Sequence, residues 1–170
     1  MATVRYDDIT YQTYGDLPVV GSHAPDLNLV NTKLANVSLS NWTGMRKIMN
    51  IFVSIEREVC AKSVRTFDRM GDGQEDLAML MVSYDLTFTH ARFGKEHGLE
   101  NVNGLSAIRH AGFGENYGVL ITDGPLAGMF SRAVVVLDEN NTVVHTEQLE
   151  RLNNEPDYQA AFRALGIEVE

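Results

Sequence analysis

Two apolar runs of strand length, with an amphipathic segment between them, restrict what this chain can fold into more than any other feature. Residues 47–54 (KIMNIFVS) and 77–83 (LAMLMVS) are nearly continuous in apolar side chains, as expected of strands covered on both faces. The segment from residue 58 to about 70 carries apolar side chains at helical spacing: Cys60, Val64 and Phe67. Gly71 and Gly73 follow where such a helix should end. The pattern predicts a strand, a helix and a second, parallel strand.

The rest of the chain adds helices and antiparallel strands to this unit. Residues 88–98 (FTHARFGKEHG) indicate a short helix after the second apolar run. Residues 132–149 (RAVVVLDENNTVVHTEQL) predict a hairpin, because Asp-Glu-Asn-Asn in their middle is turn chemistry. Three shorter segments predict a hairpin and two strands near the N-terminus: residues 4–16, 25–31 and 36–42.

A final helix is expected over residues 155–166 (EPDYQAAFRALG), with Pro156 in its first turn and Gly166 as its stop. Parallel βαβ units joined to an antiparallel hairpin and closed by a helix describe a mixed sheet covered by helices. No repeat or linker divides the 170 residues, so we expect a single α/β domain over residues 1–170. The thioredoxin-like fold has this order of elements and this size.

Charge and cysteine content exclude several classes of protein. The formal charge of −9 argues against binding to nucleic acid or to anionic membranes, because both are polyanions. No apolar run has the length of a signal sequence core or a membrane span. The single cysteine, Cys60, cannot form an internal disulfide, which favours a reduced thiol in the cytoplasm.

Cys60 has two interpretations on sequence alone. A free cysteine is among the most often buried residue types and usually packs as a small apolar side chain. In the first turn of a helix, however, unpaired backbone N–H groups and the helix dipole favour the thiolate, which is the nucleophilic form. The second interpretation requires the Cys60 sulfur to be open to a small oxidant.

Five stretches in this order and spacing resemble the thiol peroxidases of the Tpx type, a bacterial branch of the peroxiredoxins. They are GSHAPDLNLVN, RKIMNIFVSIEREVCAKSVRTFD, VSYDLTFTHARFGKEHGLENV, YGVLITDGPLAGMFSRAVVVLDENNTVV and EPDYQAAFRAL. The resemblance covers almost the whole chain. It implies a thioredoxin-like fold of the peroxiredoxin type, a homodimer, no cofactor, and reduction of hydrogen peroxide or organic hydroperoxides.

In that chemistry Cys60 is the peroxidatic thiol, which attacks a peroxide oxygen and becomes a sulfenic acid. Arg132 matches the active-site arginine of the family and would stabilise both the thiolate and the developing oxyanion. The family signature P-x-x-x-T-x-x-C falls on Val53, Arg57 and Cys60. Val53 can still cover the sulfur, whereas Arg57 either supplies a cationic donor or fills the peroxide pocket.

The resolving cysteine of the family falls on Gly94. An oxidised Cys60 would therefore need an external thiol, such as thioredoxin, a glutaredoxin or a low-molecular-weight thiol. The changes at Val53, Arg57 and Gly94 also motivate a different function, that of an impaired paralogue serving as a redox sensor or a protein-binding module. No metal site is expected, because the five histidines lack metal-ligand spacing.

Ser54, Ser63 and the pair Tyr84-Asp85 remain as secondary candidates. Ser54 and Ser63 lie near Cys60 in the sequence and could form hydrogen bonds in the site. Tyr84 and Asp85 follow the second apolar strand, at the end where sites collect in α/β folds, although a turn explains them equally well.

Overall fold

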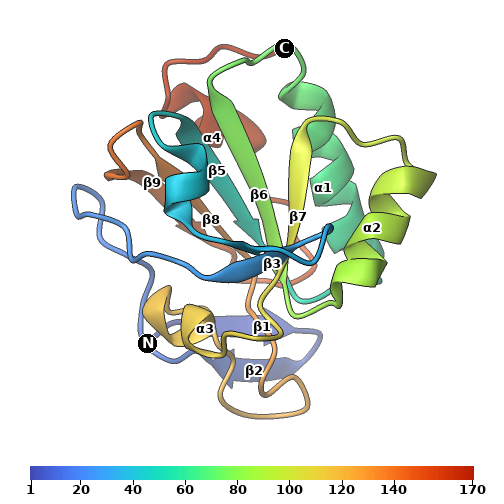
Figure 1. Cartoon of the computed structure of the whole chain (residues 1–170). Helices are drawn as coiled ribbons and strands as arrows, with labels where there is room; N and C mark the ends of the chain where they lie inside the picture. The colour runs from blue at the N-terminus through green and yellow to red at the C-terminus, as the bar shows by residue number, and fades with distance from the viewer.

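The computed structural model describes all 170 residues, and a seven-stranded sheet in the order β4-β3-β7-β6-β5-β8-β9 is its centre (Figure 1). The strands of this sheet are β3 (Leu29–Asn31), β4 (Asn36–Val37), β5 (Arg46–Ile51), β6 (Leu77–Ser83), β7 (Val102–Ser106), β8 (Ala133–Leu137) and β9 (Val143–Gln148). The helices are α1 (Glu58–Met70), α2 (Thr87–Glu96), α3 (Gly112–Asn116) and α4 (Tyr158–Arg163), with a short 3-10 helix at Leu39–Trp42. A separate hairpin pairs β1 (Thr3–Tyr6) with β2 (Ile9–Gln12).

The predicted βαβ unit is confirmed. Strands β5 and β6 are parallel, with α1 as their crossover, and β6 and β7 are parallel, with α2 as the next crossover. Every residue of β6 is buried, and so are five of the six residues of β5, as their apolar sequences require. Since β8 pairs antiparallel with β5, the sheet is mixed and the thioredoxin-like expectation holds.

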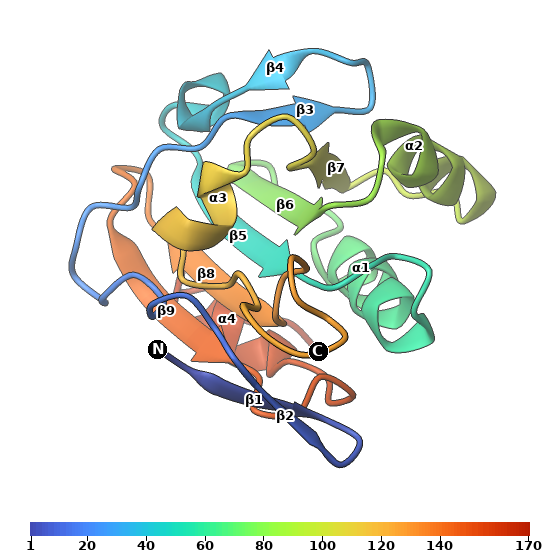
Figure 2. The same ribbon diagram turned by 90° about the horizontal axis from the view of Figure 1, so that it is seen from below.

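Alternate side chains of the central strands face two separate apolar cores. Ile48 and Met79 lie in the core under α1 and α4, whereas Met49 and Leu80 lie in the core on the opposite face, with α3. Figure 2 shows the sheet between these two layers, with the N-terminal hairpin at one end. The carboxyl ends of β5 and β6 point toward that end (Figures 1 and 2), where loops are free to build a site.

The end of the chain corrects one detail of the sequence prediction. The last helix begins at Tyr158, and its N-cap is Asp157, whose side chain accepts a hydrogen bond from Ala160 N at 3.0 Å. Pro156 therefore precedes the helix and does not lie in its first turn. An aspartate is a better N-cap than a proline because its carboxylate can accept from the free N–H groups.

Strand β7 and helix α3 were not indicated by the sequence. The residues of β7, VNGLS, include Asn103 and Gly104, which have low strand propensity. Tertiary packing explains the glycine: a Cβ at position 104 would lie 2.8 Å from His90 Cβ of α2. Helix α3 has only five residues, two of them glycine, so helical periodicity could not reveal it.

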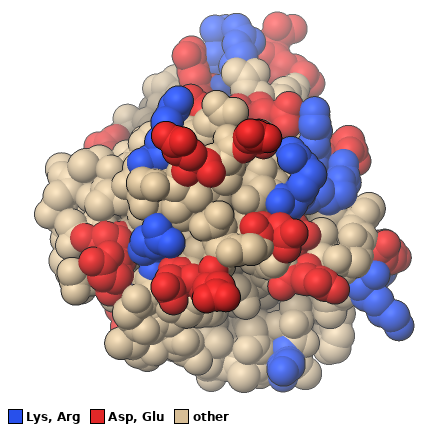
Figure 3. Space-filling view, turned by 90° about the horizontal axis from the view of Figure 1, so that it is seen from above, with Lys and Arg blue, Asp and Glu red and all other residues tan.

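Charged side chains cover the far end of the molecule without forming a basic surface. Figure 3 shows acidic and basic side chains interspersed on that face. No helix combines the length and apolar character that crossing a membrane requires.

Candidate active site

The first turn of α1 places Cys60 at the end of the loop that leaves β5. Arg57 is the N-cap residue, and its carbonyl oxygen accepts hydrogen bonds from Cys60 N at 3.0 Å and from Ala61 N at 2.9 Å. No side chain caps this helix. The sequence prediction that Cys60 lies in the first helical turn is therefore correct.

The Cys60 side chain has no solvent-exposed surface. It belongs to the apolar core under α1, together with Val53, which is 5% exposed, and Val64. Neither Cys60 nor Arg132 lines any of the five surface cavities. The expectation of an open sulfur is wrong for this conformation, and a peroxide would need a movement of the surrounding segments to reach it.

Arg132 is a buried cation whose guanidinium is only partly hydrogen-bonded. It precedes β8, which pairs with β5, and it is 1% exposed. Its Nη1 donates to the carbonyl oxygens of Leu152, at 3.2 Å, and Asn154, whereas Nε and Nη2 have no protein partner. Burial lowers the Arg132 pKa, and a charge on Cys60 would act in the opposite direction. Two unpaired donors thus lie within electrostatic reach of the sulfur.

The Arg57 side chain extends from the N-terminus of α1 to two distant segments. Its Nη2 donates to Asn153 Oδ1 at 2.6 Å, and its guanidinium carbon lies 4.7 Å from the centre of the Tyr6 ring, a cation–π distance. Its Nη1 is buried without a partner. Arg57 therefore links α1, the N-terminal hairpin and the 151–154 loop. A threonine at this position would be too short to make these contacts.

A second charged group lies on the opposite side of Arg132. Tyr158 donates a hydrogen bond from its hydroxyl to Glu155 Oε1 at 2.9 Å, and Lys62 pairs with Glu155 Oε2 at 3.1 Å. Burial, with the Glu155 carboxylate, raises the Tyr158 pKa. Burial alone would raise the Glu155 pKa, but hydrogen bonds from Lys62 and Tyr158 and the charges of Lys62 and Arg132 lower it overall. Glu155 thus stays ionised and helps to balance the positive charge of Arg132.

The serines near Cys60 have structural partners. Ser63 donates to the Cys60 carbonyl oxygen at 2.7 Å and accepts from Asn50 Nδ2 at 2.9 Å, both in the core. Ser54 donates to Asp85 Oδ1 at 2.7 Å, which joins two of the secondary candidates of the sequence. Asn153, Glu155 and Tyr158 were not predicted, because nothing in the sequence indicates that the segment before α4 folds back onto α1.

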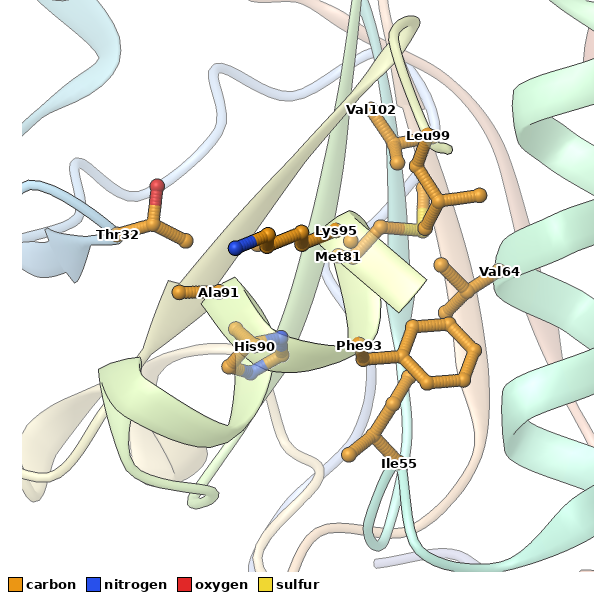
Figure 4. Close-up of a pocket in the computed structure, with 12 residues that line it drawn as sticks. Thr32, Ile55, Val64, Met81, His90, Ala91, Phe93, Lys95, Leu99 and Val102 are labelled. Atoms are coloured by element: carbon orange, nitrogen blue, oxygen red, sulfur yellow. The ribbon is translucent and has the colours of Figure 1, made fainter. Parts of the chain in front are cut away.

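Gly94 lies on α2, at a cavity of about 270 Å³ between this helix, α1 and the sheet (Figure 4). Apolar side chains form one wall, and His90 and Lys95 are the polar residues on the helix itself. A Cβ at position 94 would meet no atom within 4 Å. The position that the resemblance assigns to a second cysteine is thus open space. No group of three or more His, Cys, Asp and Glu side chains is arranged to hold a metal ion.

Comparisons with known proteins agree with this arrangement. Residues 19–162 match the family model described as Redoxin. The chain is 40% identical to the thiol peroxidase of Corynebacterium glutamicum over 97% of this chain and 99% of that protein. It is 42% identical to the thiol peroxidase of Mycobacterium bovis over 98% and 99%, respectively.

Two solved structures share the fold over almost the full length. The thiol peroxidase from Chromobacterium violaceum superposes with a TM-score of 0.89 at 29% identity, covering 96% of this chain and 95% of that one. A peroxiredoxin-like protein from Aquifex aeolicus superposes with a TM-score of 0.90 at 26% identity, covering 96% of each chain.

Proposed function

The chain belongs to the Redoxin family, among thiol peroxidases of the Tpx type, and on that premise we propose that residues 1–170 form one peroxidase domain in which Cys60 reduces hydrogen peroxide or an organic hydroperoxide. The thiolate of Cys60 attacks the terminal peroxide oxygen, and a sulfur–oxygen bond forms as the oxygen–oxygen bond breaks. The leaving oxygen departs as water or an alcohol after it takes up a proton. Cys60 is left as a sulfenic acid.

The observation that carries this proposal is the buried guanidinium of Arg132. A buried cation with unpaired donors is costly unless a negative partner completes it. The two free donors, Nε and Nη2, can bond the Cys60 thiolate before the attack and the negative peroxide oxygen during it. Donors held rigidly toward developing charge stabilise the transition state more than the ground state. The contacts of Nη1 with the 152 and 154 carbonyls keep the guanidinium in place.

Arg57 controls the entry of peroxide in this proposal. It ties the first turn of α1 to Tyr6 and Asn153, and the sulfur below has no exposed surface. Release of the Arg57 side chain uncovers Cys60, while Val53 remains as an apolar wall of the pocket. Such a release costs little, because one hydrogen bond and one exposed cation–π contact contribute about 1–2 kcal/mol together.

Recycling depends on an external thiol, because Cys60 is the only cysteine. Attack by thioredoxin or a low-molecular-weight thiol on the sulfenic acid releases water and leaves a mixed disulfide, and a second thiol then restores Cys60. A reducing cytoplasm supplies such thiols. A homodimer completes the proposal: Leu86, Phe88 and Ile108 are 52%, 68% and 53% exposed, just past the neighbouring ends of β6 and β7.

The deciding experiment follows Cys60 while the reduced protein reacts with stoichiometric hydrogen peroxide, by intact mass with a sulfenic-acid trap. The proposal expects oxidation at least about 100-fold faster than that of a free thiol, since arginine donors stabilise the transition state. Cys60→Ser is the control and should not react. Oxidation at the rate of a free thiol would favour the redox-sensor or protein-binding function instead.

A further inference from the structure

Asp85 lies where the loop after β6 meets the loop that carries the thiol helix, and its carboxylate accepts three hydrogen bonds. Ser54 Oγ donates to Oδ1 at 2.7 Å, while Ile55 N and Ser83 Oγ donate to Oδ2 at 2.7 and 2.6 Å. Ser83 is fully buried, and Ile55 is 3% exposed. Hydrogen bonds to a charged acceptor are among the stronger ones in proteins. The loop after β5 is therefore held by a single side chain from the neighbouring strand.

From Asp85 a continuous set of hydrogen bonds leads to the Cys60 backbone. The carbonyl oxygen of Ser54, whose hydroxyl is bonded to Asp85, accepts from Arg57 N at 3.1 Å. The carbonyl oxygen of Arg57 in turn accepts from Cys60 N at 3.0 Å. Because no side chain caps α1, these backbone bonds define where its first turn begins. A shift of the 54–57 loop would change the direction of the Cys60 sulfur.

The same carboxylate is connected to α2. Ser83 has one hydroxyl hydrogen, which it donates to Asp85, so its oxygen accepts from Nε2 of the buried His90 at 3.0 Å. The backbone N–H of Asp85 also donates to this oxygen, at 3.1 Å. His90 is thus neutral, with its proton on Nε2. The arrangement fixes the Asp85 side chain from behind, so that it cannot follow a movement of the loop.

From these contacts we propose that Asp85 is a positioning residue of the thiol site: it fixes the 54–57 loop and thereby aims the Cys60 sulfur at Arg132 and the peroxide. Asp85 touches neither the reacting atoms nor Arg132. The inference rests on the proposed peroxidase function, since it concerns the geometry of the same thiol. Misplacement of a nucleophile by about 1 Å can cost about 100-fold in rate.

The test compares Asp85→Ala and Asp85→Asn with Asp68→Ala. Asp68 is a matched control, because its carboxylate also holds a loop through two backbone N–H groups, those of Glu100 and Asn101, but beyond the other end of α1. In Asp85→Asn the side-chain amide can keep its oxygen toward Ile55 and Ser83 and turn its NH₂ toward Ser54, whose hydroxyl oxygen can accept. The asparagine variant should therefore rescue the loop, whereas alanine should release it.

We expect Cys60 oxidation by hydrogen peroxide at pH 7 to slow by at least about tenfold in Asp85→Ala, and to stay within about threefold of the native rate in Asp85→Asn and Asp68→Ala. Circular dichroism and the unfolding midpoint confirm that each variant is folded at the assay temperature. An Asp85→Ala rate within about threefold of the native rate would overturn the proposal. An Asp85→Asn variant as slow as Asp85→Ala would also overturn it, since the charge rather than the position would then matter.

A second readout separates this inference from the peroxidase function. The rate of alkylation of Cys60 by iodoacetamide needs no peroxide chemistry. It should rise in Asp85→Ala, because a released loop uncovers the sulfur, and stay unchanged in Asp68→Ala. If the native protein reacts with peroxide only as a free thiol does, the peroxidase function fails, and the alkylation rates alone decide whether Asp85 holds the loop. Equal alkylation rates in Asp85→Ala and the native protein would refute it.

Discussion

Helices α1 and α2 are successive crossovers of the same sheet, yet one is fully packed and the other is not. Helix α1 buries five residues, including Cys60, and no cavity reaches the sulfur. Helix α2 has a glycine at position 94 and a cavity of about 270 Å³ beneath it. The packed helix carries the reactive atom, while the position where relatives carry a second thiol is empty. Reaction and recycling therefore place different demands on the two helices, and the predictions below test that division.

The largest effect is expected at Arg132. Arg132→Ala removes the two donors that lie near Cys60, so oxidation of Cys60 by peroxide should slow by about 100- to 1,000-fold, measured by stopped-flow at pH 7. Arg46→Ala is the control, because Arg46 also donates to a backbone carbonyl, that of Leu165 at 3.0 Å, far from the thiol. A rate unchanged in Arg132→Ala would show that packing around α1, not charge, activates the sulfur.

The second prediction concerns the buried imidazole of α2. Burial lowers the His90 pKa from 6.5 to about 4, and the Asp85 charge opposes this only in part. Between these values the unfolded chain binds a proton that the folded chain does not. Stability is therefore complete above pH 6.5 and is lost as the pH falls toward 4. The loss at pH 4.5 amounts to about 2 kcal/mol.

Replacement of His90 by glutamine should remove this part of the acid sensitivity. Urea unfolding at pH 7 and 4.5 measures it, and the native protein should lose about 2 kcal/mol more than His90→Gln over this interval. His23→Gln, at an exposed histidine, should lose as much as the native protein. Equal losses in all three proteins would mean that α2 opens enough in acid to hydrate the imidazole.

Arg57 provides the third prediction, because it closes the end of α1. Arg57→Thr removes the contacts with Asn153 and Tyr6 and restores the hydroxyl that the family signature has at this position. Peroxide should oxidise Cys60 about tenfold faster, as a hydrogen bond to a charged group contributes about 1.5 kcal/mol. Arg57→Ala separates the two causes: it opens the site without supplying the hydroxyl. A slower Arg57→Thr variant would contradict the role of Arg57 as a cover.

The sequence predicted the fold where one principle dominated. Residues 77–83 are apolar throughout and form β6 with the bounds expected, because a strand covered on both faces needs no polar side chain. Helix α1 was also predicted with the correct bounds. Strand β7 was missed, because Asn103 and Gly104 follow the space left by His90 and not a local strand preference. Such a constraint exists only after α2 has packed.

The candidate site was predictable only for its chain-local part. The position of Cys60 in the first turn of a helix follows from periodicity. Its burial, and the contacts of Arg57 with Tyr6 and Asn153, depend on segments about 50 and 100 residues away in the chain. The partial pairing of Arg132 depends likewise on carbonyl groups that precede α4. Chemistry can be inferred from residue types, whereas access to the sulfur is a property of the assembled loops.

The smallest effect is expected at Gly94, and it tests directly whether α2 is underpacked. Gly94 lies within α2, its φ is not positive, and an added Cβ would meet open space. Gly94→Ala should therefore stabilise the protein by about 0.5–1 kcal/mol through the lower entropy of the unfolded chain, which raises the unfolding midpoint by about 2–4 °C. Peroxide oxidation of Cys60 should not change, because α1 is untouched.

Gly104 lines the same cavity and should give the opposite result. Its added Cβ would lie 2.8 Å from His90 Cβ and 2.9 Å from His90 Nδ1, so Gly104→Ala pushes α2 away from β7 and should destabilise by about 1–3 kcal/mol. Both midpoints are measured by differential scanning calorimetry. If Gly94→Ala destabilised as Gly104→Ala does, the cavity would close around Gly94 in solution, and α2 would be as tightly packed as α1.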